Sequence, residues 1–226
     1  MVIGLDGCRY GWIAACISDN DNLSFSLLAQ LTDLPQLNEA GQILIDMPVG
    51  FADQQYRLCD IAARDLLRPF RHSSVFFTPH RDAVFASSYA EACRINRLRT
   101  GTAISVQTWH ICGKIIEVDR YIAANPGIPL AESHPELCFY GLSGQACRHP
   151  KNTQPGISER LGIIASKEPQ YRSTIGQAMH AIRKSAAKPD DILDAAVLAI
   201  IAKRNRLIVL PERTDGSDTP TITYGR

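Results

Sequence analysis

Two aspartates follow short apolar segments, at positions from which carboxylates can bind a ligand. Asp6 follows the apolar run at residues 2–5, and Asp46 follows the run at 43–45. Continuous apolar character is typical of parallel strands that are buried on both faces. We therefore predict that the two segments are neighbouring parallel strands. Both carboxylates would then lie in the crevice at the carboxyl ends of the strands, where open α/β sheets bind ligands.

Two carboxylates that share one crevice repel each other unless a cation lies close by. Asp191 and Asp194 are three residues apart in a predicted helix, so that both would lie on one face of it. Clusters of oxygen ligands select hard cations such as Mg²⁺ or Mn²⁺, and these ions promote phosphodiester cleavage. The chemistry that these acids predict is metal-assisted hydrolysis.

Each of these acids also has a purely structural interpretation. An Asp before Gly, such as Asp6, is common in turns, and Asp46 could shape the turn that follows it. Asp191 and Asp194 could stabilise the positive end of a helix that begins at Pro189. For the helix acids taken singly, the structural role is favoured. The prediction of a site depends on the combination of two strand-end acids with a late pair of helix acids.

The predicted elements around these acids follow an α/β pattern. Short apolar runs at 2–5, 11–17 and 23–28 are separated by turns, which predicts an antiparallel meander, and a fourth strand covers 42–46. Further strands are expected at 129–132 and 206–210, and helices at 32–40, 53–67, 88–99, 105–124, 158–165, 170–185 and from 189 onward. Residues 69–79 are predicted to be irregular, and 221–224 to belong to a polar tail.

Composition restricts the class of protein. A chain of 226 residues, of which 45% are hydrophobic, can bury one substantial core, so we predict a single α/β domain over 1–226 with a helical insertion at about 53–125. The formal net charge of +1 offers no general field for a polyanion or an acidic membrane. Seven scattered cysteines without a Cys-x-x-Cys pair are typical of reduced thiols.

The sequence contains no export signal. It also contains no apolar run that approaches the roughly 20 residues of a membrane span. We therefore expect a cytoplasmic protein without a membrane partner. The sequence does not indicate an oligomeric state.

Several basic residues could contact phosphate groups, because Arg and Lys both bind phosphate oxygens. Taken singly, each is better explained as a solvated residue or as the partner of a nearby acid, as Lys114 could be for Glu117 or Asp119. His134, which precedes a proline, is expected to be structural. The candidates for substrate binding are Arg64, Arg71, Arg81, Lys114 and Lys151.

Distinct sequence blocks run along nearly the whole chain. In order, they are Gly4-Leu5-Asp6-Gly7-Cys8-Arg9-Tyr10-Gly11-Trp12, Ile45-Asp46-Met47-Pro48-Val49-Gly50, Arg57-Leu58-Cys59-Asp60, Ala63-Arg64, Ser73-Ser74-Val75-Phe76, Lys114-Ile115-Ile116-Glu117-Val118-Asp119, Glu132-Ser133-His134-Pro135-Glu136, Lys151-Asn152-Thr153 and Asp190-Asp191-Ile192-Leu193-Asp194-Ala195. These blocks resemble a family of predicted ribonuclease-H-like nucleases, which is a domain family of unknown function.

The resemblance implies a ribonuclease-H-like fold. In that fold, helices flank a five-stranded mixed sheet in which strands 1 to 3 are antiparallel and strands 1, 4 and 5 are parallel. By analogy, Asp6 would bridge the metal ions from the first strand, Asp46 would bind from the fourth, and Asp191 or Asp194 would complete the site from the last helix.

The resemblance also implies one further acid at the site. Glu132, on the predicted fifth strand, or Glu136, inside the His-Pro-Glu block, would add a metal ligand or a general base. We slightly prefer Glu136 for the catalytic role and keep Glu132 as a candidate ligand.

These observations predict a metal-dependent nuclease or phosphodiesterase that uses Mg²⁺ or Mn²⁺ and acts on a nucleic acid or a phosphorylated small molecule. One alternative is a relative of sugar kinases and actin-like ATPases, which share this architecture and which Leu5-Asp6-Gly7 loosely resembles. Those proteins usually duplicate the fold over a much longer chain. Another alternative is a binding module without catalytic activity, because a fold alone does not establish a function.

Overall fold

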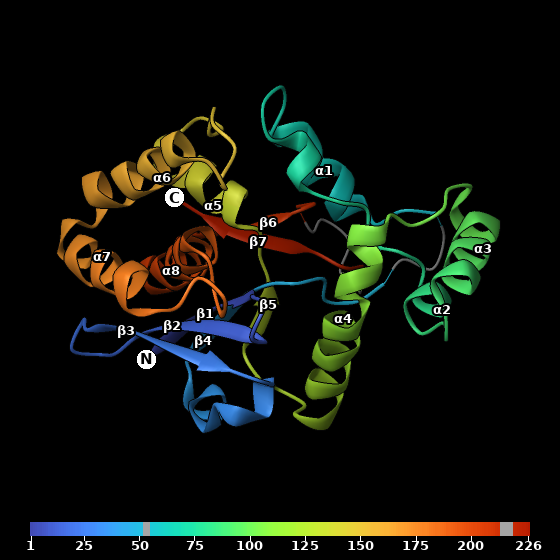
Figure 1. Cartoon of the computed structure of the whole chain (residues 1–226), viewed down its shortest axis with the longest axis horizontal. Coiled ribbons are helices and arrows are strands. Elements are labelled where there is room, and N and C mark those ends of the chain that lie inside the picture. The colour runs from blue at the N-terminus through green and yellow to red at the C-terminus, as the bar shows by residue number, and fades with distance from the viewer. Residues whose placement is uncertain (52–54, 213–218) are drawn as a thin grey trace.

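In the computed structural model, which describes residues 1–51, 55–212 and 219–226, five strands form the central sheet in the order β3-β2-β1-β4-β5 (Figure 1). β1 pairs antiparallel with β2, and β2 with β3, whereas β1 and β4, and β4 and β5, are parallel. The predicted fold, with antiparallel strands 1 to 3, parallel strands 1, 4 and 5, and flanking helices, is confirmed. The bounds are β1 Val2–Gly7, β2 Trp12–Ile17, β3 Leu23–Leu28, β4 Gln42–Asp46 and β5 Leu130–Glu132.

The helix α8 (Pro189–Arg204) packs across β1, β2 and β4 on one face of the sheet. Its residues from Ile192 to Ala202 are buried, and many are alanines, which allow a close approach. Gly4 on β1 also permits this close approach of the helix to the sheet, because a Cβ atom at Gly4 would overlap the backbone of Ala195 and Ala199. This contact fixes the first turn of α8 relative to the ends of β1 and β4.

The opposite face of the sheet is covered by α4 (Val106–Ala124) and by the 3-10 turns η1 (Leu31–Asp33) and η2 (Pro35–Glu39). These two turns occupy the segment 32–40, where we predicted a short helix. Strand side chains alternate between the two faces, so that Ile43 and Ile45 belong to the core with α4 while Leu44 belongs to the core with α8. The same alternation places the side chain of Asp46 on the α8 face.

Four helices lie between β4 and β5 in the described part of the chain: α1 (Leu58–Leu66), α2 (Arg81–Val84), α3 (Tyr89–Thr100) and α4, together with the 3-10 turn η3 (His72–Ser74). They occupy the region of the predicted helical insertion at about 53–125. Asp53, at which the prediction began, lies outside the described residues. In Figure 1, α2 and α3 lie at the edge of the molecule farthest from α6 and α7.

After β5 the chain forms α5 (Pro135–Ser143), α6 (Gln154–Lys167), the 3-10 turn η4 (Pro169–Tyr171) and α7 (Arg172–Ala181) before it reaches α8. None of the helices in the described residues combines the length and the apolar character that crossing a membrane requires.

The prediction of a polar tail at 221–224 was wrong, because residues 222–225 form a strand. β7 (Ile222–Gly225) pairs antiparallel with β6 (Leu207–Leu210) in a second sheet. Ile222, Thr223 and Tyr224 are buried, and Thr223 also forms a parallel bridge with Ser133, just after β5. β-branched and aromatic residues favour strands, and here that propensity outweighs their polar groups.

Candidate functional site

Asp6 and Asp46 are direct neighbours at the carboxyl ends of β1 and β4, because the parallel register pairs residue 6 with residue 46. Asp6 is only 5% exposed. Burial, followed by the charge of Asp46, raises the pKa of Asp6 well above its ordinary value, and burial also raises the pKa of Asp46. Each carboxyl group of the pair therefore keeps its proton to a higher pH than an isolated aspartate does.

Asp194 approaches this pair from the first turns of α8. Its side chain is 1% exposed, and its Oδ2 atom forms an ion pair with Lys151. Its Oδ1 atom has no hydrogen-bond partner among the described residues. Burial alone would lower the pKa of Lys151, but the charges of Asp194, Asp6 and Asp46 raise it well above its ordinary value. Lys151 therefore pairs with Asp194 and adds positive charge to the surroundings of Asp6 and Asp46.

Asp191 has a structural contact at the start of α8. Its Oδ2 atom accepts a hydrogen bond from the backbone N–H of Lys188, at 2.7 Å, which caps the helix. Burial raises the pKa of Asp191. Asp191 also lines the same cavity as Asp6 and Asp194, so its capping role does not remove it from the candidate site.

Glu132 lies on the other side of the sheet from the aspartate pair. The parallel register pairs Glu132 with Ile45 and not with Leu44 or Asp46. The side chain of Ile45 belongs to the core with α4. Both carboxylate oxygens of Glu132 accept hydrogen bonds from Arg57, each at 2.6 Å, and Oε2 also accepts one from the N–H of Val49 at 2.6 Å. The structure therefore pairs Glu132 with Arg57, and Glu132 lines the same cavity as Asp6 without facing it across the sheet.

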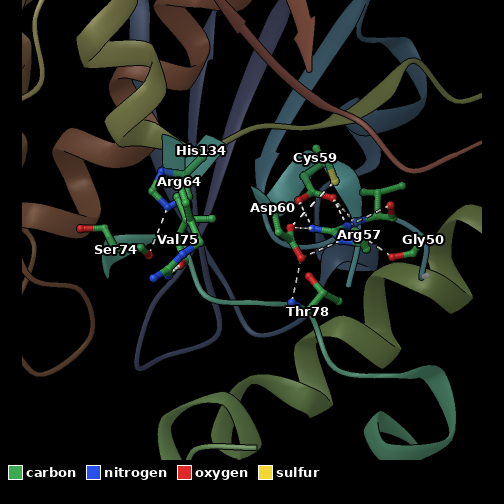
Figure 2. Close-up of polar contacts among 11 residues, drawn as sticks. Gly50, Arg57, Cys59, Asp60, Arg64, Ser74, Val75, Thr78 and His134 are labelled. Atoms are coloured by element: carbon green, nitrogen blue, oxygen red, sulfur yellow. Dashed lines mark hydrogen bonds and ion pairs between the residues drawn. The ribbon is translucent and has the colours of Figure 1, made fainter. Parts of the chain in front are cut away.

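The predictions from sequence gave no role to Arg57, Asp60 or Thr78, although all three line the cavity. Arg57 is buried and donates to Asp60 at 2.5 and 3.2 Å as well as to Glu132. Asp60 in turn accepts a hydrogen bond from the backbone N–H of Thr78 at 2.9 Å (Figure 2). The available signal was the spacing of Arg57 and Asp60, three residues apart within the helix predicted at 53–67.

His134 contacts the start of the segment 74–78, and the end of this segment is bonded to Asp60 through Thr78. Its Nδ1 atom accepts from the N–H of Glu136 at 3.2 Å, which caps α5, and its Nε2 atom lies 3.3 Å from the carbonyl oxygen of Ser74. Figure 2 shows the chain from Ser74 to Thr78 running between the His134 contact and the Arg57 network. These contacts agree with the structural role expected of His134.

Glu136 is buried in the first turn of α5 and also lines the cavity. Its Oε1 atom forms an ion pair with Arg160, which is fully buried and also donates to the carbonyl oxygens of His149 and Gly156 at 3.1 and 3.0 Å. Its Oε2 atom has no hydrogen-bond partner among the described residues. Glu136 thus keeps one oxygen available for a ligand.

All five residues predicted to bind substrate lie in the described part of the chain, and of these Lys114 and Lys151 line the cavity. Lys114 donates to the carbonyl oxygen of Gly11, and its Nζ atom lies 4.6 Å from the centroid of the Trp12 ring. Burial lowers the pKa of Lys114. Two cationic side chains are therefore placed where an anionic ligand would lie.

The remaining basic candidates have other contacts. Arg64 donates to the carbonyl oxygen of Val75, which holds the segment shown in Figure 2, and Arg71 donates to the carbonyl oxygen of Phe70 at 2.9 Å. Arg81 forms an ion pair with Asp119 at 2.8 Å. These contacts favour the structural alternatives that the sequence left open for them.

The cavity has a volume of about 350 Å³. Its acids and its two lysines share the space with apolar walls, and three buried oxygens of its lining residues have no hydrogen-bond partner in the described part of the chain. Buried polar atoms in native proteins are nearly always satisfied, so these oxygens indicate a missing ligand or water. They are Thr78 Oγ1, Glu136 Oε2 and Asp194 Oδ1, and the apolar walls include Met47, Pro48, Val75, Phe76, Ile111 and Ile222.

A search of residues 1–51, 55–212 and 219–226 finds no three His, Cys, Asp or Glu side chains grouped so that they could hold a metal ion. The chemistry of the donors nevertheless fits a hard cation, because Asp6, Asp46 and the free oxygen of Asp194 are all oxygen ligands. Mg²⁺ is commonly held by one or two carboxylates and keeps several water molecules. Asp6 and Asp46 are two carboxylates of the kind that such sites use.

Comparisons with curated proteins and with solved structures find no match to this chain. Residues 4–214 match a protein family described as "Protein of unknown function (DUF429)". This match contains Asp6, Asp46, Lys151, Asp194 and the other candidate site residues. The chain therefore belongs to the DUF429 family.

Proposed function

We propose that this protein is a metal-dependent phosphodiesterase or nuclease of the ribonuclease-H-like type. The observation that carries this proposal is the placement of the buried Asp6 beside the half-buried Asp46 at the ends of two parallel strands, where both face a cavity. Two buried carboxylates in contact cost free energy unless a proton or a cation lies with them. A divalent cation bound at the pair would supply that positive charge.

The sheet supports the proposal through its topology. Its strand order and directions are those that the resemblance to ribonuclease-H-like nucleases implies. The acids of β1, β4 and α8 also come to one cavity, as the analogy requires. The family match leaves the activity open, so the chemistry of the site carries the argument.

In the proposed reaction, Asp6 and Asp46 hold the cation, and Asp194 provides a further oxygen. The bound ion would activate the attacking water and neutralise charge on the phosphate. Glu136 has a free oxygen in the same cavity and would accept the proton of that water. Lys114 and Lys151 would bind phosphate oxygens.

Hydrolysis of bis(p-nitrophenyl) phosphate and of a panel of single-stranded, duplex, hybrid and branched nucleic acids, in Mn²⁺ or Mg²⁺, tests this proposal. We expect activity that EDTA abolishes and that Asp6→Asn and Asp46→Asn each reduce by at least a factor of about 100. Asp65→Asn changes an exposed acid on α1 and serves as the control for charge. Full activity of the Asp6→Asn protein would contradict the proposal.

A second candidate function is the binding of a phosphorylated small molecule without hydrolysis. The size of the cavity favours it, because about 350 Å³ lies within the range of small-molecule pockets, which begins at roughly 300 Å³. Calorimetric titration with nucleoside monophosphates, on a protein that cleaves none of the panel, would support this function. Turnover of ATP would instead support the kinase-like alternative.

A further inference from the structure

We infer that Lys151 is an internal counter-ion of the site, which a divalent cation displaces from Asp194 and releases to bind the phosphate of the substrate. This inference rests on the proposed function, since it assumes that a divalent cation binds at Asp6 and Asp46. It adds a coupling between cation binding and phosphate binding, carried by a single side chain.

The distribution of charge in the cavity gives the first argument. Asp6, Asp46, Asp191 and Asp194 line the cavity together, and among the described residues Lys151 forms an ion pair with one of them, Asp194. The ammonium of Lys151 also interacts with the charges of Asp6 and Asp46. It therefore stabilises the cluster of acids in the way that a bound cation would.

The difference in mobility between the two partners gives the second argument. Asp194 is 1% exposed and is fixed in the buried first turns of α8, so its position is set by the packing of that helix on the sheet. The Lys151 side chain is 41% exposed and leaves the backbone ahead of α6, which Thr153 caps. A lysine has a flexible stem of four carbons, so Lys151 can move while Asp194 stays in place.

The unpartnered oxygen of Asp194 gives the third argument. Oδ1 is buried without a hydrogen-bond partner among the described residues, while Oδ2 is held by Lys151. Release of the ammonium would leave both oxygens available to a cation with its water molecules. Because Lys151 already lines the cavity, its ammonium would remain within reach of a phosphate bound there.

Calorimetric titration of Mn²⁺ into the wild type and into Lys151→Met tests the displacement. The Lys151→Met protein no longer has the competing ammonium, so we expect it to bind Mn²⁺ on the order of tenfold more tightly. Lys167→Met removes an exposed lysine from the end of α6 and should bind Mn²⁺ like the wild type. Equal or weaker binding by Lys151→Met would overturn the inference.

Melting temperatures give a readout that does not depend on activity. In EDTA, Lys151→Met leaves Asp194 buried without its partner, so it should melt below the wild type, and Mn²⁺ should raise its melting temperature by more than it raises that of the wild type. If Lys151→Met does not fold, Lys151→Gln is titrated and melted in the same way. A smaller Mn²⁺ effect in the variant than in the wild type would contradict the displacement.

Inorganic phosphate tests the second half of the inference. The wild type should bind phosphate at least about tenfold more tightly in Mg²⁺ than in EDTA, and Lys151→Met should lose most of that increase although it still binds the metal. A variant that keeps the full increase would show that Lys151 does not bind the phosphate.

The failures of the two proposals are distinguishable. If neither the wild type nor Lys151→Met binds Mn²⁺ or Mg²⁺, the proposed function fails and the inference fails with it. If both bind the ion with the same affinity, the cation site stands and only the role of Lys151 is wrong.

Discussion

Gly4 on β1 and Ala195 on α8 lie so close together that a Cβ atom at position 4 would overlap the carbonyl oxygen of Ala195. The obstacle is backbone, which cannot rotate away as a side chain can. The contact also lies two residues from Asp6 and one residue from Asp194. The spacing between the acid of β1 and the acid of α8 is therefore set by the absence of a side chain at Gly4.

We expect Gly4→Ala to destabilise the protein by about 1–3 kcal/mol or more, because overpacking at a rigid contact forces the backbone to shift. Urea denaturation measures this change. Gly162→Ala is the matched control, because Gly162 lies in α6 with no atom near the position of its Cβ. In that helix the same substitution should stabilise by roughly 0.5–1 kcal/mol. Equal effects at the two positions would show that the contact at Gly4 can adjust.

The stability of the protein should depend on pH through Asp6. Because burial and Asp46 raise the folded-state pKa of Asp6 above its ordinary value of 3.8, the folded protein holds this proton to a higher pH than the unfolded chain does. The free energy of unfolding in EDTA should therefore fall as the pH rises from about 3.8 through the raised pKa. Thermal melts across this range measure the effect.

Asp6→Asn removes the buried charge and should remove that pH dependence. In EDTA at pH 7 we expect the variant to be more stable than the wild type by roughly 1–3 kcal/mol, and to lose the stabilisation that Mn²⁺ gives the wild type. Asp65→Asn, at an exposed position, should change neither property. If Asp6→Asn is the less stable protein in EDTA, the carboxylate has a favourable partner in the absence of metal.

Arg57 should be essential for stability. Its removal in Arg57→Ala leaves Asp60 and Glu132 buried without their cation, and breaking a buried ion pair in this way costs about 3–5 kcal/mol. Arg68→Ala breaks an exposed pair with Asp65, for which we expect roughly 0–1 kcal/mol. Denaturation in urea gives both values, and a small effect at Arg57 would mean that water or another group replaces its hydrogen bonds.

Glu132→Gln separates the structural role of Glu132 from a role as a metal ligand. Because both of its oxygens contact Arg57, we expect a loss of about 1–3 kcal/mol in stability and no change in the affinity for Mn²⁺. Glu136→Gln should instead lower the rate of hydrolysis, since Glu136 keeps a free oxygen in the cavity. Loss of Mn²⁺ binding in Glu132→Gln would restore Glu132 as a ligand.

The position of Asp6 beside Asp46 could be predicted because it depends on local pattern. Two apolar runs that each end in an acid indicate parallel buried strands, and strand alternation then places both acids on one face. Glu132 could not be placed in this way, since β5 is only three residues long and its pattern does not indicate a face. Its register with Ile45 was needed to show that it points away from the pair.

The sequence by itself predicted the meander of the first three strands and the pairing of β1 with β4, with an acid near the carboxyl end of each, because apolar runs and turns are local features. Only the tertiary structure decided which cation meets which acid. Lys151 and Asp194 are 43 residues apart, and Arg57 and Glu132 are 75 residues apart. Such pairs form only when the packed helices and strands bring distant charges together, so no local sequence pattern predicts which charges will pair.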